Sequence, residues 1–172
     1  MRIVAGKWAG RTLTSPAGKV RPTTEYLRDA WMNEIAEALE GSRIIDLFAG
    51  SGALGIEAMS RGARYADFIE NNPAALHALK ANIAQLRAGD RARIFKQDAI
   101  QFVERLPAGK YDIAFADPPY GSHKADRIVR FWSEVPFANV LCIEHALDHE
   151  LPGKGRRRRF GEHMVTFFHR RM

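Results

Sequence analysis

An Asp-Pro-Pro-Tyr tetrapeptide, Asp117 to Tyr120, follows directly on the apolar segment 111–116. Pro118 and Pro119 carry no N–H, so the loop offers mainly acceptors: the carboxylate of Asp117 and nearby carbonyl oxygens. Such acceptors hold both N–H bonds of an amine and stabilise the positive charge that develops on its nitrogen during attack. The ring of Tyr120 offers a flat face on which a base can stack. The pattern favours methyl transfer to the exocyclic amine of a base, although Asp-Pro is also common in rigid turns.

A second candidate site lies in segment 43–58, which reads RIIDLFAGSGALGIEA. The apolar run at its start predicts a buried parallel strand, and a helical pattern begins at about Ala53. A strand, a glycine turn and a helix in this order present backbone N–H groups and a helix N-terminus to a ligand. Gly50 and Gly52 allow close approach of that ligand, and Gly55 removes a side chain where the helix must pack on the strand.

The Gly-x-Gly-x-x-Gly spacing alone is a weak signal that dinucleotide-binding folds share. The carboxylate of Asp46 adds to it, because burial in an apolar strand is costly unless the turn N–H groups or a cationic ligand group donate hydrogen bonds. Together with the Asp-Pro-Pro-Tyr loop, this pattern favours S-adenosylmethionine over NAD. A tight turn that binds nothing is the alternative. The expected cofactor-binding residues of the turn are Asp46, Phe48, Ala49, Gly50, Ser51 and Gly52.

Further acids follow the next two predicted strands. Glu70 lies about 20 residues beyond the glycine turn, where an acid accepts from the ribose hydroxyls of a nucleoside cofactor, or alternatively caps a helix. Asp98 also follows a strand, where it can accept from the exocyclic amine of an adenine.

Strand and helix patterns alternate from Arg43 to Ile143, which predicts a Rossmann-like, doubly wound α/β sheet with crossover helices. A first helix with Leu27, Trp31 and Leu39 on one face is expected after a cap at Thr23 or Thr24. The expected strands are 44–48, 65–69, 92–95, 111–116 and 139–143, and later helices open near residues 53, 73, 99 and 124.

Two hairpins are expected outside this alternating region. Segments 2–4 and 11–13 flank a glycine-containing bend, and segments 156–160 and 164–168 are joined near Gly161. The sheet should therefore be mostly parallel with an antiparallel C-terminal strand. We expect residues 1–22 to form an N-terminal β-hairpin appendage that binds RNA, and residues 23–172 to form one catalytic domain.

The net charge of +6 is unevenly distributed: residues 1–24 carry +5 and residues 153–172 carry +6, so the remainder carries 6 − 11 = −5. Two basic ends on an acidic body indicate a nucleic-acid footprint, with solvated tails as the alternative. The candidate nucleic-acid contacts are Arg2, Lys7, Trp8, Arg11, Arg21 and Arg28.

Composition excludes several classes of protein. No apolar run is long enough to span a bilayer, and the N-terminus has no secretory pattern. The single cysteine, Cys142, forms no internal disulfide, so a cytoplasmic location is the default. The six histidines show no metal-ligand spacing, and no metal is expected.

The two central motifs resemble those of class I S-adenosylmethionine-dependent N-methyltransferases. Segment 2–11 (RIVAGKWAGR) and residues 21–24 (RPTT) resemble one family in particular, the bacterial small-subunit ribosomal RNA guanine-N2 methyltransferases. Ser60-Arg61-Gly62-Ala63 and Glu144-His145 share this likeness.

The resemblance implies methyl transfer to the N2 amine of a guanine in 16S rRNA, with the rRNA or the 30S particle as partner. Separately from the resemblance, we expect a monomer. It assigns methionine binding to the glycine turn, ribose binding to Glu70, and the surroundings of the adenine to Asn71, Asp98 and Ala99. It also implies that the N-terminal hairpin contacts RNA.

Three alternatives remain open at this point. Asp-Pro-Pro-Tyr recognises an amine and no particular base, so an adenine or cytosine N-methyltransferase, on RNA or DNA, fits as well. A non-catalytic nucleic-acid binding module is the second alternative. A NAD-dependent dehydrogenase is a distant third, since no partner for hydride transfer stands out.

Overall fold

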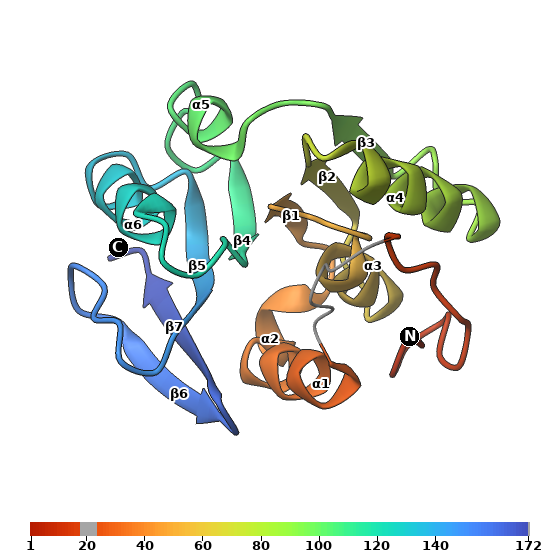
Figure 1. The fold of residues 1–172 in the computed structure, drawn as a ribbon, viewed down its shortest axis with the longest axis horizontal. Coiled ribbons are helices and arrows are strands. Elements are labelled where there is room, and N and C mark those ends of the chain that lie inside the picture. Colours follow the sequence, from red (N-terminus) through yellow and green to blue (C-terminus); the bar gives the residue numbers. More distant parts are fainter. Residues whose placement is uncertain (18–23, 172) are drawn as a thin grey trace.

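A computed structural model describes residues 1–17 and 24–171 of the chain. Its strands form one sheet in the order β3-β2-β1-β4-β5-β7-β6 (Figure 1). The strands are β1 (Arg43–Leu47), β2 (Tyr65–Ile69), β3 (Ala92–Phe95), β4 (Tyr111–Ala116), β5 (Ala138–His145), β6 (Arg156–Phe160) and β7 (His163–His169). The helices are α1 (Glu25–Glu34), α2 (Ala36–Leu39), α3 (Ala53–Ser60), α4 (Pro73–Gln85), α5 (Ala99–Val103) and α6 (Lys124–Glu134).

Strands β1 to β5 pair in parallel, and β7 adds to β5 in the antiparallel sense with β6 beyond it. Successive side chains of a strand point to opposite faces, so Ile44 packs in one core cluster and Ile45 in the other. Helices α1 to α4 cover the first face, and α5 and α6 cover the second (Figure 1). The predicted doubly wound, mostly parallel sheet is confirmed, including the closing C-terminal hairpin.

The helix expected over residues 27–39 is divided in two. Ile35 lies between α1 and α2 with φ −119° and ψ 16°, outside the helical region. Thr24 caps α1, and its hydroxyl accepts from the N–H of Leu27 at 3.1 Å. The alternative cap, Thr23, and the expected domain boundary after residue 22 lie outside the described residues, so that division stays a prediction.

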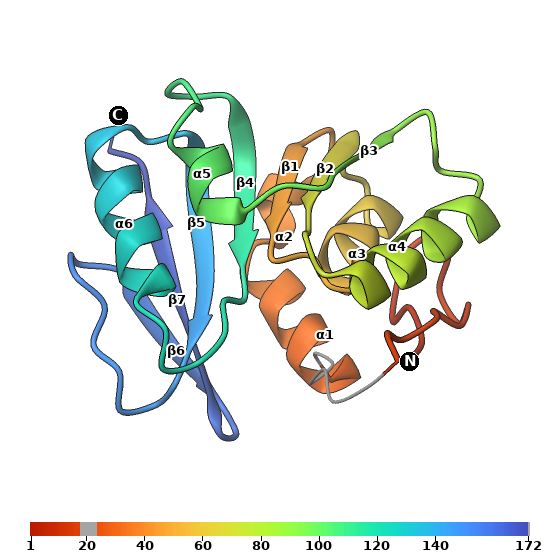
Figure 2. The same cartoon turned by 45° about the horizontal axis from the view of Figure 1, so that its top comes forward.

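The two arms of the N-terminal hairpin pair more briefly than expected, through one isolated antiparallel bridge between Arg2 and Thr12. The N–H of Ile3 donates to the carbonyl of Arg11 at 2.9 Å. Ile3, Trp8 and Leu13 are buried in the same core cluster as α1 and α3. The segment therefore rests on the body of the protein (Figure 2).

Within the described part of the chain, no helix is long and apolar enough to cross a membrane. Cys142 on β5 is fully buried, and burial raises the pKa of its thiol to about 12. At neutral pH this thiol is protonated and unreactive, as expected for a cysteine in an apolar run.

Candidate active site

Both predicted motifs leave the sheet at the same edge. Strands β1 and β4 are parallel neighbours with Leu47 opposite Ala116, so the glycine turn and the Asp117 loop follow adjacent strand ends. Ile69 of β2 lies opposite Leu47 on the other side, and Phe95 of β3 lies opposite Ile69. The carboxyl ends of β1 to β4 therefore bring every predicted cofactor and catalytic residue to one edge, where parallel sheets bind ligands.

The glycine turn has a constrained backbone. Phe48, Gly50 and Gly52 all have positive φ, at 57°, 57° and 85°. A bulky residue such as Phe48 seldom adopts this region, and such outliers cluster at functional sites. A Cβ on Gly52 would lie 2.5 Å from Cδ1 of Leu79, whereas a Cβ on Gly50 would meet open space. Gly50 thus exposes its backbone at the edge where a ligand would approach.

Asp46 lies beneath this turn with only 1% of its surface exposed. Its Oδ2 accepts from the N–H of Gly55 at 3.0 Å, which ties β1 to the first turn of α3. A Cβ on Gly55 would lie 2.5 Å from the ring of Phe68 and 3.2 Å from Asp46 Oδ2, so this glycine is needed for packing. Burial raises the pKa of Asp46 well above its usual range, and the nearby Glu70 adds to the rise.

Replacing Asp46 by Asn should therefore leave the protein at least as stable as the parent at neutral pH. Because the folded pKa of Asp46 is raised, the folded state binds more protons than the unfolded state above the unfolded pKa of about 4. Wild-type stability should fall as pH rises from the unfolded pKa of about 4 through the raised folded pKa. Asn keeps an acceptor for the N–H of Gly55 and adds no buried charge. Urea unfolding at several pH values measures this difference.

Asp112→Asn is the matched control, and it is expected to change folding stability at neutral pH in the opposite direction. The Arg43 guanidinium lowers the pKa of Asp112, so this variant should lose stability at neutral pH and match the parent as pH falls through that lowered pKa. If Asp46→Asn behaved in the same way, the Asp46 carboxylate would be stabilised as an anion and our account of its burial would be wrong.

Glu70 joins two loops of the candidate site. Its Oε2 accepts from the N–H of Gly50 at 2.8 Å, and its Oε1 accepts from the N–H groups of Asn71 and Asn72 at 2.9 Å each. The cap of α4 is Asn72, whose Oδ1 accepts from Ala75 at 3.0 Å. Glu70 is therefore placed against the glycine turn and does not cap the helix.

Asp98 has a structural role that the sequence reasoning overlooked. Its Oδ1 accepts from the N–H of Gln101 at 3.0 Å and caps α5. Ala99 is buried in the first turn of that helix, and the exposed Asn71 lies in the loop after β2. All of these residues lie at the carboxyl edge of the sheet, which is compatible with an adenine there.

The Asp-Pro-Pro-Tyr loop continues into a buried polar network. Tyr120 is 43% exposed, and its hydroxyl donates to Oε1 of Glu144 at 2.9 Å. Nδ1 of His163, on β7, lies 2.7 Å from the same oxygen of the fully buried Glu144. A small hollow of about 30 Å³ lies beside this network, lined by Pro118 to Ser122 and by residues at the end of β5, and the glycine turn does not reach it.

Glu144 and His163 were missed as members of the site. Glu144 follows an apolar run just as Glu70 does, and that signal could have identified it. Nothing in the spacing linked His163 to Tyr120, since the two residues are far apart in sequence.

The predicted RNA contacts are distributed over several environments. Arg2 is exposed and pairs with Glu25 at 3.6 Å, and Nη2 of Arg11 donates to the carbonyl of Gln85 at 2.9 Å. Lys7 is exposed above the ring of Trp8, which is itself buried. Arg21 lies outside the described residues.

The expectation for Arg28 is wrong in this structure. Its side chain is fully buried, with Nε 3.6 Å from Oε2 of the fully buried Glu57, and its Nη2 donates to the carbonyl of Arg2. A guanidinium in this position holds the N-terminal segment to α1 and α3 and does not face a nucleic acid. The helical spacing could not show that residue 28 points inward.

The C-terminal arginine run lies on β6, with Arg156 to Arg159 exposed. Arg156 and Arg158 pair with Glu34 of α1 at 2.6 and 2.9 Å. Half of this run is therefore engaged with the body of the protein.

Comparison with known proteins agrees with this geometry. A protein-family model described as "Conserved hypothetical protein 95" matches residues 1–169. Ribosomal RNA small subunit methyltransferase D of Escherichia coli strain K12 is 40% identical over 121 residues, which cover 70% of this chain and 60% of that protein. This chain thus aligns with less than two thirds of that relative. The Haemophilus influenzae protein of the same name is 31% identical over 138 residues, covering 78% of this chain and 71% of that protein.

Solved structures show the same fold. The structure described as "Putative methyltransferase yhhF from Escherichia coli" superposes with a TM-score of 0.86 at 30% identity. The match covers 99% of this chain and 97% of that chain.

Proposed function

The chain belongs to the family described as "Conserved hypothetical protein 95", and we propose that it is an S-adenosylmethionine-dependent methyltransferase of small-subunit ribosomal RNA. The proposed acceptor is the exocyclic N2 amine of a guanine. The observation that carries the proposal is the pairing of β1 with β4, because the glycine turn and the acceptor-rich loop leave adjacent strand ends. The names of the relatives support an rRNA substrate, and the choice of guanine rests on the resemblance of the N-terminal motifs.

The residues of the glycine turn fit S-adenosylmethionine. Gly50 offers an open backbone at positive φ, and Glu70 lies within hydrogen-bond distance of it with a carboxylate that can also accept from ribose hydroxyls. Asp98 and Asn71 would lie near the adenine, and the turn with Asp46 would hold the methionine part. When bound, the cofactor supplies an electrophilic methyl group on a sulfonium.

The Asp-Pro-Pro-Tyr loop would hold the base. The carboxylate of Asp117 and the carbonyl of Pro118 would accept from the two N–H bonds and direct the nitrogen lone pair toward the methyl donor. Asp117 would also stabilise the charge that develops on the nitrogen and accept its proton during or after attack. Tyr120, anchored through its hydroxyl to Glu144, would stack on the base.

The experiment that tests this function is methyl transfer from a labelled donor to 30S particles, naked 16S rRNA and DNA, followed by nucleoside analysis. N2-methylguanosine is the expected product. Methyladenosine or methylcytidine as the sole product would overturn the base assignment. Donor binding in calorimetry without transfer to any of the substrates would favour a binding module.

Tyr120→Ala should raise KM for the RNA about 5- to 150-fold, because base–aromatic stacking contributes about 1–3 kcal/mol per base. Tyr120→Phe keeps the ring and loses the hydroxyl, with its hydrogen bond to Glu144 and its 3.5 Å contact with Nδ1 of His163, so its effect should be several-fold smaller. Tyr26→Ala on α1 is the control, since this tyrosine is 69% exposed and lies outside the Asp-Pro-Pro-Tyr loop. Equal effects of Ala and Phe at position 120 would exclude stacking as the role of the ring.

A further inference from the structure

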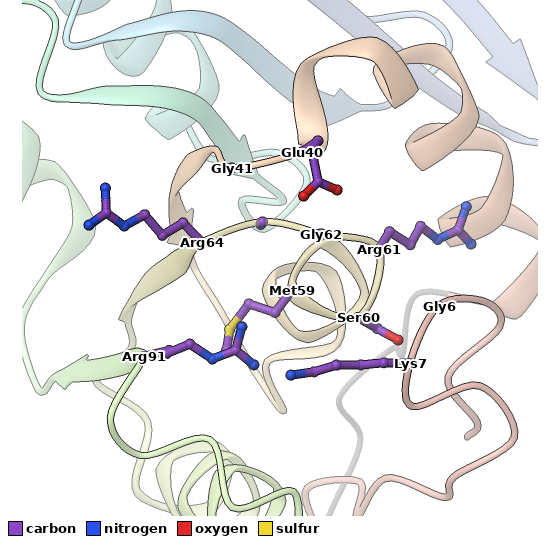
Figure 3. Close-up of a pocket in the computed structure, with 11 residues that line it drawn as sticks. Gly6, Lys7, Glu40, Gly41, Met59, Ser60, Arg61, Gly62, Arg64 and Arg91 are labelled. Carbon is purple, nitrogen blue, oxygen red and sulfur yellow. The ribbon is translucent and has the colours of Figure 1, made fainter.

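A hollow of about 580 Å³ opens at the opposite edge of the sheet from the candidate active site (Figure 3). It lies between the N-terminal turn, the last residues of α3, and the segments that lead into β2 and β3. Its charged lining residues are Lys7, Glu40, Arg61, Arg64 and Arg91. The glycine turn and the Asp117 loop follow the carboxyl ends of the strands, whereas this hollow lies at their amino ends. A strand of five residues such as β1 separates the two edges by about 16 Å.

The cationic side chains that line this hollow differ in whether they pair with a carboxylate. Arg61 is occupied, since its Nη2 lies 2.8 Å from Oε1 of Glu57 and 3.0 Å from Oδ1 of Asp29. Lys7 and Arg91 instead reach toward each other across the hollow, and Arg64 extends from its rim (Figure 3). In the part of the chain that the structure describes, no carboxylate pairs with these three side chains, so their positive charges are the ones available to an anion.

Lys7 and Arg91 share one aromatic support. Nζ of Lys7 lies 4.4 Å from the ring centroid of Trp8, and Cζ of Arg91 lies 5.6 Å from it. Partial desolvation and the charge of Arg91 lower the pKa of Lys7, while Asp90 opposes that shift. Two like charges held close together are unfavourable until an anion lies between them.

The backbone that carries Lys7 is fixed. The N–H of Lys7 donates to the carbonyl of Ser60 at 2.9 Å, and the N–H of Trp8 donates to the Ser60 hydroxyl at 3.0 Å. That hydroxyl donates in turn to the carbonyl of Ala5 at 2.6 Å. A Cβ on Gly6 would lie only 1.9 Å from the backbone carbonyl oxygen of Ser60, so only glycine allows the two backbones to approach this closely. A preorganised cation loses little entropy on binding.

We propose that Lys7 and Arg91, with Arg64 at the rim, bind a backbone phosphate of the ribosomal RNA at a point separate from the methylated base. This inference rests on the proposed function for its RNA partner. Among the described residues, Lys7, Arg64 and Arg91 give +3, and the nearby acids Glu40 and Asp90 give −2, so the local charge is 3 − 2 = +1. A phosphodiester with one negative charge matches this balance better than a free phosphate or a nucleotide, which carry more. The RNA would then contact both edges of the sheet.

The test compares Lys7→Gln/Arg91→Gln with the parent in binding of 16S rRNA over a series of salt concentrations. We expect the double variant to bind about tenfold more weakly at low salt, with a salt slope reduced by about one. Arg105→Gln/Arg130→Gln is the charge-matched control, because both arginines are exposed on the α5 and α6 side of the sheet. Unchanged donor affinity in calorimetry would show that the double variant is folded, and Arg64→Gln provides a milder single change if it is not.

The outcomes separate this inference from the proposed function. If the Lys7→Gln/Arg91→Gln variant showed the same RNA affinity and salt slope as the control, the proposed phosphate site would be wrong, even if the parent methylates rRNA. If the parent bound inorganic phosphate or pyrophosphate and the double variant did not, while both bound RNA equally well, the hollow would be a site for a free anion. That result would also contradict the proposed RNA phosphate site. Failure of the parent to methylate any rRNA bears on the proposed function alone.

Discussion

Replacing Asp117 by Asn should lower kcat for methyl transfer by about 100- to 1000-fold, the usual consequence of removing a group that stabilises charge in a transition state. Asn keeps the size of the side chain but carries no negative charge to stabilise the attacking nitrogen, and it does not accept its proton. The loop should keep its shape, since Pro118 and Pro119 restrict it. Single-turnover transfer to 30S particles, with donor and RNA both saturating, measures the change in the chemical step.

Asp148→Asn is the matched control, because this exposed acid lies in the loop after β5, near the same edge of the sheet. Calorimetry should give the Asp117 variant the donor affinity of the parent, since the glycine turn belongs to a different strand end. Full activity of Asp117→Asn would remove this residue from the mechanism. A loss confined to KM would reassign it to RNA binding.

The sequence was sufficient to predict the strands and the edge that they share. Glycine, proline and the switch from apolar to polar residues mark strand ends locally, so β2, β3 and β4 have the predicted bounds. Parallel pairing then brings all strand ends to one edge without any knowledge of side-chain contacts. This is why Gly50, Glu70 and Asp117 could be grouped in advance.

The sequence could not reveal partnerships between distant residues. Arg28 looked like a surface charge because its partner Glu57 is 29 positions away, and helical spacing alone did not show which way it points. The contact of Glu144 with His163 depends on the antiparallel addition of β7, which follows from the whole sheet. Arg64 and Arg91 each directly precede a predicted strand. Basic residues at the amino ends of strands were therefore a signal in the sequence for the hollow at that edge of the sheet.

Replacing Glu57 by Leu should cost about 3–5 kcal/mol of folding stability, because it removes the buried carboxylate that lies 3.6 Å from the buried guanidinium of Arg28. Glu57 also accepts from the N–H groups of Val4 and Ala5, at 3.0 to 3.2 Å, and from Arg61 at 2.8 Å. One fully buried carboxylate thus joins α1, α3 and the N-terminal segment. Urea unfolding at neutral pH measures the loss, and Glu37→Leu on the exposed side of α2 should change stability by no more than about 0.5 kcal/mol.

Arg28→Met distinguishes the two roles of the Glu57 carboxylate, as counter-ion of Arg28 and as acceptor for the N–H groups of the N-terminal segment. The single Arg28 variant leaves Glu57 with Arg61 and two backbone donors, so it should cost less than Glu57→Leu. Loss of Glu57 should in addition loosen the segment that carries Lys7, and amide exchange at Val4 and Ala5 should then accelerate while that of the β4 core stays slow. Equal costs for the two variants, with unchanged exchange at Val4, would mean that Glu57 serves only as the counter-ion of Arg28 and does not hold the N-terminal segment in place.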